Sequence, residues 1–83
     1  MNYPKVQSVK AVDEHTLLVV FDNTDKRLYD VTPLFKREAF FPLRNFSFFK
    51  NVQVDKSGYA VFWNEDIDLS EHELWTNGTI VDK

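Results

Sequence analysis

Two histidines and a run of carboxylates are the residues whose types could support catalysis. His15 and His72 are the only histidines of the chain. Neither belongs to a Ser/His/Asp spacing or to a Gly-x-Ser-x-Gly elbow, the arrangements that activate a nucleophilic serine. His15 precedes an expected strand, where an exposed polar residue is ordinary, and His72 lies between two glutamates at an expected helix start. We predict no catalytic residue and expect that the protein is not an enzyme.

The carboxylates between Glu65 and Glu73 offer oxygen ligands for a divalent metal, together with the imidazole of His72. Their spacing does not fit an EF-hand loop, which needs a central glycine and a glutamate at its twelfth position. The His-Glu-x-x-His zinc pattern is absent as well. Acidic residues also stabilise a helix start, because they interact favourably with the positive end of its dipole. We predict no metal site, and the one enzyme hypothesis left open is that these carboxylates line a pocket.

The cysteine and glycine counts exclude further classes of site. The chain has no cysteine, which excludes disulfides, Cys-ligated zinc, iron–sulfur clusters and thiol catalysis. Its two glycines, Gly58 and Gly78, cannot build the glycine-rich loops that hold nucleotide phosphates. We therefore predict no cofactor.

Basic and aromatic residues alternate between Lys36 and Lys50 and indicate a binding surface. Residues 26–50 carry six Lys and Arg against two Asp and Glu, whereas residues 51–83 carry two against seven. Phe46 and Phe48 cannot both face the same side of a helical turn, so we expect one of the two to be exposed. An exposed phenylalanine beside Arg44 suits a protein interface. The predicted partner-binding residues are Arg37, Arg44, Phe46 and Lys50.

The same basic segment is compatible with two alternative roles. The basic and acidic segments could lie side by side in the fold and attract one another. Alternatively, the rings of residues 36–50 stack on bases while the cations hold phosphates, which is weak RNA or single-stranded DNA binding. The sequence pI of about 5.2 argues against general nucleic-acid affinity. We expect a protein partner first and nucleic acid second.

Length and composition predict one small soluble domain over residues 1–83. The chain has 83 residues, 43% of them hydrophobic and 16% aromatic, which is enough for one core but not for two. The N-terminus lacks the apolar core of a secretory signal, and no apolar run reaches the roughly 20 residues of a membrane helix. We expect a cytoplasmic protein that does not bind a membrane.

Short elements must position the candidate surface. Residues 16–21 are apolar on both faces, which predicts a central strand covered on both sides. Thr32 is expected to cap a short helix with Pro33 in its first turn, and Pro42 prevents one long helix through residues 39–49. Another strand is expected at residues 5–12, where valines three residues apart require a β-bulge to face the same side. A turn at 22–25 then leads to an expected strand at 27–31.

The C-terminal part predicts a hairpin and a capped helix. Residues 52–55 and 59–63 flank a turn in which Gly58 adopts a positive φ. Ser70 and Glu73 form a capping box for a helix at 71–77, and Gly78 is expected to end it in a left-handed conformation. The sum is an α+β fold, a small antiparallel sheet of about five strands in two hairpins with two or three short helices. An unpaired edge strand of that sheet could join two copies into a homodimer.

The order and spacing of several motifs resemble the short bacterial domain-of-unknown-function family 2442, over roughly residues 4–77. The motifs that carry the resemblance are Tyr29-Asp30-Val31-Thr32-Pro33-Leu34, Phe40-Phe41-Pro42-Leu43-Arg44-Asn45, Phe49-x-x-Val52-x-Val54-Asp55, Gly58-x-x-Val61-x-Trp63 and Asp68-Leu69 followed by Leu74-Trp75. Phe46 departs from the family pattern, in which a proline is usual at this position.

The resemblance implies a small α+β domain without established catalytic residues. It also implies genes that often lie beside another small uncharacterised family, in an arrangement likened to toxin–antitoxin pairs. We therefore expect a non-enzymatic protein-binding module, antitoxin-like or the regulatory partner in a two-gene operon.

Overall fold

The computed structural model describes residues 3–81, and it divides their strands between two antiparallel sheets. The first and last two residues of the predicted domain 1–83 lie outside the described residues. The first sheet has the order β1-β2-β3-β7, formed by β1 (Val6–Ala11), β2 (Thr16–Phe21), β3 (Lys26–Asp30) and β7 (Thr79–Ile80). The second has the order β4-β5-β6, formed by β4 (Gln53–Val54), β5 (Ala60–Phe62) and β6 (Asp68–Ser70).

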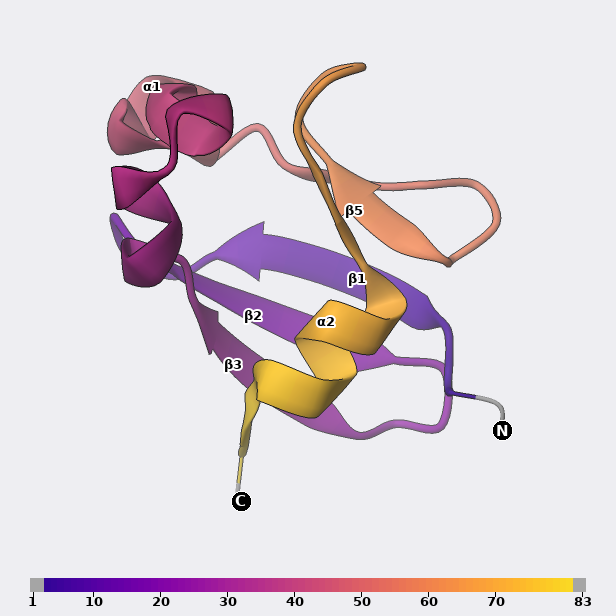
Figure 1. Cartoon of the computed structure of the whole chain (residues 1–83). Coiled ribbons are helices and arrows are strands. Elements are labelled where there is room, and N and C mark those ends of the chain that lie inside the picture. The colour runs from indigo at the N-terminus through magenta and orange to yellow at the C-terminus, as the bar shows by residue number, and fades with distance from the viewer. Residues whose placement is uncertain (1–2, 82–83) are drawn as a thin grey trace.

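Helical segments lie at one end of the first sheet and across its face. The 3-10 helices η1 (Thr32–Lys36) and η2 (Glu38–Arg44) and the α-helix α1 (Phe46–Phe49) follow β3, and α2 (Glu71–Asn77) follows β6. Figure 1 shows α1 at the upper end of the molecule and α2 in front of β2 and β3. The predicted α+β class is confirmed, but two sheets of four and three strands replace the single predicted sheet of about five, and the short strands β6 and β7 were not predicted.

The strand β2 is central, but only one of its faces is fully buried. Leu17, Val19 and Phe21 are inaccessible to solvent, while Leu18 and Val20 on the other face are half-buried. The expectation of cover on both sides is wrong, because α2 (Figure 1) packs on the buried face, where the Trp75 ring lies 5.1 Å from that of Phe21, and the opposite face of β2 is only half-buried. Leu18 lies opposite Leu28 in the register of β2 and β3, and such cross-strand pairs shield each other without a covering layer.

One hydrophobic core joins the two sheets to the helices. Its largest fully buried side chains are Phe21, Phe49, Leu17, Leu43 and Leu74. The predicted bulge in β1 is present as a register shift between Val6 and Ser8. The predicted hairpin is confirmed too, and Gly58 has the expected positive φ of 80°.

The Ser70 cap of α2 forms as predicted, but the Glu73 side chain and the end of the helix at Gly78 differ from the prediction. The Ser70 hydroxyl accepts a hydrogen bond from the Glu73 amide at 3.1 Å, and the helix has the predicted bounds. The Glu73 carboxylate, however, accepts a hydrogen bond from the hydroxyl of Tyr29 at 2.7 Å. Gly78 is extended, with φ −78° and ψ 156°, so the predicted left-handed stop is wrong.

The segment after β3 is wound more tightly than expected. Val31, not Thr32, is the N-cap of η1, because the Thr32 amide donates to the Asp30 side chain at 2.9 Å. Pro42 lies inside η2. A proline cannot donate to an α-helical ladder, so the chain keeps to short 3-10 pieces before the single turn of α1. No helix among residues 3–81 has the length and apolar character needed to cross a bilayer.

We expect Tyr29→Phe to lower the free energy of unfolding by about 1–2 kcal/mol, since it removes the hydrogen bond between β3 and α2. Burial, and then the hydrogen bond to Glu73, raise the pKa of Tyr29 well above its usual value. Because this pKa is higher in the folded than in the unfolded chain, the contribution is complete below about pH 10 and is lost as the pH rises further. Urea unfolding at neutral and alkaline pH measures both effects.

Tyr59→Phe is the matched control, because the Tyr59 ring is exposed. Its unfolding free energy should stay within about 0.5 kcal/mol of the parent protein. Equal losses in the two variants would contradict a specific contribution of the Tyr29 hydroxyl.

Candidate functional site

Two exposed phenylalanines mark the candidate interface. Phe41 on η2 is 54% exposed and Phe46 on α1 is 44% exposed. We call Phe41, Arg44, Phe46 and Lys50 the basic aromatic surface. A large ring left open to water is a feature of interaction sites when it is grouped with others.

A cation lies over each of these two rings. The Arg44 guanidinium carbon is 4.4 Å from the centre of the Phe41 ring, and the Lys50 Nζ is 5.9 Å from the centre of the Phe46 ring. The negative face of an aromatic ring attracts a cation at such distances. The spacings of three and four residues bring each pair to one face of a helical turn. The surface therefore presents rings and positive charge together.

Three of the four predicted partner-binding residues belong to the basic aromatic surface, and the fourth does not. Arg44, Phe46 and Lys50 belong to the basic aromatic surface, and Phe46 is the exposed one of the pair Phe46 and Phe48. Arg37 instead lies 5.6 Å from the ring of Phe40, which packs against the core. The positive charge of Arg37 also counteracts the rise in the pKa of Tyr29.

Phe41 is the residue that sequence reasoning missed. Its neighbours Phe40 and Leu43 pack inward, and nothing in the local composition separates an inward from an outward phenylalanine. The available signal was its spacing of three residues from Arg44, which suits a cation–ring pair on a helical turn.

Within residues 3–81, the positive charges of this surface have no carboxylate partner. Within residues 3–81, the ion pairs at 4.0 Å or less involve only His15, with Asp13 and Asp30. No lysine or arginine of this part of the chain lies within 4.0 Å of a carboxylate oxygen, so the basic and acidic segments form no direct ion pair here, and their attraction over longer distances stays a prediction. The exposed side chains of Arg44 and Lys50 remain available to other molecules.

A buried contact fixes α1 beneath the exposed residues. Phe49 is fully buried and stacks on Trp63, with ring centres 6.0 Å apart and planes 19° from parallel. The Trp63 indole nitrogen also donates to the Phe49 carbonyl at 2.7 Å. Asn45 caps the helix, since its side chain accepts from the Ser47 amide at 2.9 Å. The basic aromatic surface therefore rests on a rigid base.

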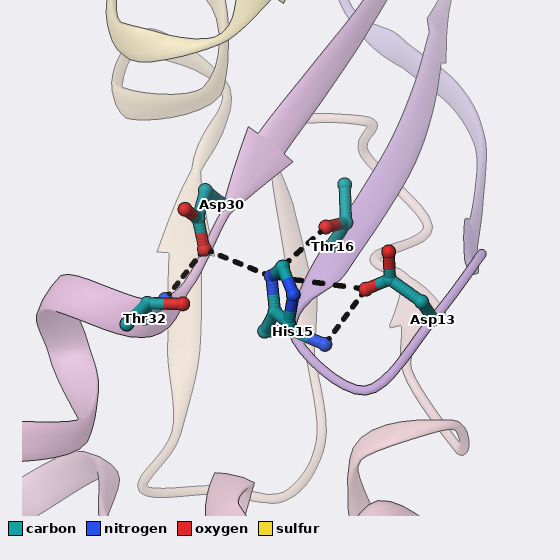
Figure 2. Close-up of polar contacts among 5 residues, drawn as sticks. All are labelled: Asp13, His15, Thr16, Asp30 and Thr32. Carbon is teal, nitrogen blue, oxygen red and sulfur yellow. Dashed lines mark hydrogen bonds and ion pairs between the residues drawn. The ribbon is translucent and has the colours of Figure 1, made fainter.

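His15 forms the densest polar cluster (Figure 2). Its Nδ1 is 3.3 Å from the Asp30 Oδ1, 3.1 Å from the Thr16 hydroxyl and 3.8 Å from the Asp13 Oδ1. Hydrogen bonds from Thr32 lower the pKa of Asp30, and the His15 amide, which donates at 2.9 Å, lowers that of Asp13.

This cluster does not have the geometry of a catalytic relay. In a Ser-His-Asp triad the nucleophile and the carboxylate bind opposite nitrogens of the imidazole. Here Thr16 and both carboxylates contact the same nitrogen, Nδ1. The side chains of His15 and Asp30 are also 49% and 60% exposed. The cluster ties the β1–β2 turn to the end of β3.

The remaining polar features are shallow. A hollow of about 730 Å³ lies between the N-terminal segment and Tyr59, with Lys5, Asp22 and Glu71 on its walls. A smaller hollow of about 220 Å³ is lined by Asp55, Ala60, Phe62, Asn64, Glu65 and Asp68. Within residues 3–81, no polar or charged residue is buried, and no group of three or more His, Asp or Glu could hold a metal ion.

Comparison with known families agrees with the motifs. The family model DUF2442, described as a protein of unknown function, matches residues 6–79, and the chain belongs to this family. The resemblance predicted from the motifs is thereby confirmed. No curated protein and no solved structure matches the chain.

Proposed function

We propose that this protein is a non-enzymatic module that binds another protein through the basic aromatic surface. The observation that carries the proposal is the pair of exposed rings, Phe41 and Phe46, each beneath a cation that has no carboxylate partner within residues 3–81. Aromatic residues and arginine are enriched in the energetically dominant parts of protein interfaces. A rigid α1 also lowers the entropy that binding must overcome.

The proposed role is that of an antitoxin-like or regulatory partner encoded in a two-gene operon and acting in the cytoplasm. The gene arrangement implied by the family resemblance supports this role. The binding partner would then be the small protein encoded beside it, with carboxylates and apolar groups on its contact surface.

Weak binding of RNA or single-stranded DNA is the second candidate. The same rings and cations form a platform on which bases could stack while phosphates meet Arg44 and Lys50. The net charge of −3 weighs against it, because non-specific nucleic-acid affinity depends on excess positive charge.

The test begins with the tagged protein, recovered from a lysate of its own host with and without nuclease. We expect a stoichiometric protein partner that survives nuclease treatment. Recovery of nucleic acid whose binding falls steeply with salt would favour the second candidate. The captured partner is then purified, and its affinity is measured by titration calorimetry.

Charge reversal identifies the surface. We expect Arg44→Glu/Lys50→Glu to weaken partner binding about tenfold or more. The matched control is Lys10→Glu/Lys26→Glu, which makes the same charge change at two exposed lysines of β1 and β3. If both double variants bind the partner as tightly as the parent protein, the basic aromatic surface is not the interface.

A further inference from the structure

We infer that the basic aromatic surface also binds an acidic surface on a second copy of this chain, forming a two-fold dimer. The acidic surface consists of Glu65, Asp66 and Asp68, all exposed, in the turn between β5 and β6 and on β6. None of these carboxylates has a lysine or arginine partner within residues 3–81. The molecule thus carries two unpaired surfaces of opposite charge.

The two surfaces adjoin at one end of the fold. Lys50 directly follows Phe49, and the acidic turn directly follows Trp63, while Phe49 and Trp63 are joined by their stacked rings and by a hydrogen bond. Figure 1 shows α1 and the turn after β5 at the same, upper end of the molecule. Although they adjoin, no ion pair joins them.

This arrangement suits a closed dimer. In a two-fold interface, each contact occurs twice, with the same surface patch used by both copies. An axis near the contact of Phe49 and Trp63 would place the basic aromatic surface of one copy on the acidic surface of the other, and the reverse. Both sets of charges then gain opposite partners at once, and the exposed rings leave water.

The acidic surface also offers a place for a basic side chain. The hollow of about 220 Å³ has Asp55, Glu65 and Asp68 on its walls together with the Phe62 ring. Carboxylates around an aromatic ring recognise a guanidinium or ammonium group by charge and by cation–π attraction. Arg44 and Lys50 of the second copy are the side chains that would enter it.

This inference does not rest on the proposed function, because it is tested on the purified protein alone. If both hold, a second copy and the protein partner compete for the basic aromatic surface. Dimer formation would then lower the concentration of chains that are free to bind the partner.

The test is sedimentation velocity of the full chain over a concentration series, at about 50 mM and about 500 mM salt, since salt screens surface charges. We expect a dimer at low salt that dissociates at high salt. Arg44→Glu/Lys50→Glu and Glu65→Lys/Asp66→Lys should each raise the dimer dissociation constant about tenfold or more. Lys10→Glu/Lys26→Glu should leave it unchanged.

The decisive experiment mixes the two interface variants and measures whether they associate with each other. One variant is acidic and the other basic on both halves of the interface, so the mixture should form a heterodimer although neither variant pairs with itself. Rescue in the mixture also shows that both variants are folded. A monomeric parent protein at all concentrations, a dimer indifferent to both reversals, or a mixture that stays monomeric would each overturn the inference.

Discussion

Phe49→Ala is expected to lower the free energy of unfolding by about 3–5 kcal/mol. The side chain is fully buried, and it stacks on Trp63 at the junction of α1 with the second sheet. Truncation removes the ring from the core and leaves a cavity that the rigid surroundings close only in part. A domain of this size has a total stability of roughly 4–12 kcal/mol, so the variant should lose a large part of it.

Urea unfolding followed by tryptophan fluorescence measures this loss. Phe46→Ala is the matched control, because it makes the same truncation in the same helix at a ring that is 44% exposed. We expect the control to lose about 1 kcal/mol or less. Similar losses at both positions would show that Phe49 is not the anchor of α1.

Gly78→Ala is expected to destabilise the protein by about 2–3 kcal/mol, a typical cost of overpacking. A Cβ at position 78 would lie 2.5 Å from the Leu74 carbonyl oxygen and 2.9 Å from the Arg27 Cβ. Neither atom is the far end of a flexible side chain, so α2 and β3 would have to separate. The need for glycine arises from this close approach, since the backbone at Gly78 is extended.

Separation of α2 from β3 would also disturb Arg27. Its guanidinium lies 3.8 Å from the centre of the Trp75 ring and donates to the Trp75 carbonyl at 2.9 Å. Asn77→Ala, one residue earlier at an exposed position, is the control and should change stability by less than about 0.5 kcal/mol. Thermal and urea unfolding compare the two variants, and an equally stable Gly78→Ala would contradict the packing argument.

Elements with local causes were predictable from the sequence. The strand at 16–21 and the helix at 71–77 have the predicted bounds. A run of β-branched and aromatic residues suits the pleated surface of a strand, and the Ser70 hydroxyl satisfies an amide three residues away, within the same turn. The positive φ at Gly58 follows in the same way from the short turn between β4 and β5, where the Gly58 amide donates to the Asp55 carbonyl at 2.9 Å.

Predictions that needed a distant partner were less successful. Glu73 bonds to Tyr29, which lies 44 residues earlier, and spacing within one helix contains no information about such a contact. The open face of β2 depends on where α2 and the second sheet pack. The two-residue strand β7 exists because the chain after α2 passes beside Arg27 and Leu28.

Some features of the candidate surface were likewise predictable from the sequence, and others depended on tertiary packing. Charge and composition, which are local properties, directed the prediction to residues 36–50, and the departure of Phe46 from the family pattern singled out that residue. The exposure of Phe41, the separate position of Arg37 and the absence of lysine or arginine ion pairs within residues 3–81 followed from the packed fold. These features depend on which side of η2 and α1 faces the core. Long-range packing around Phe49 and Trp63 determines that orientation.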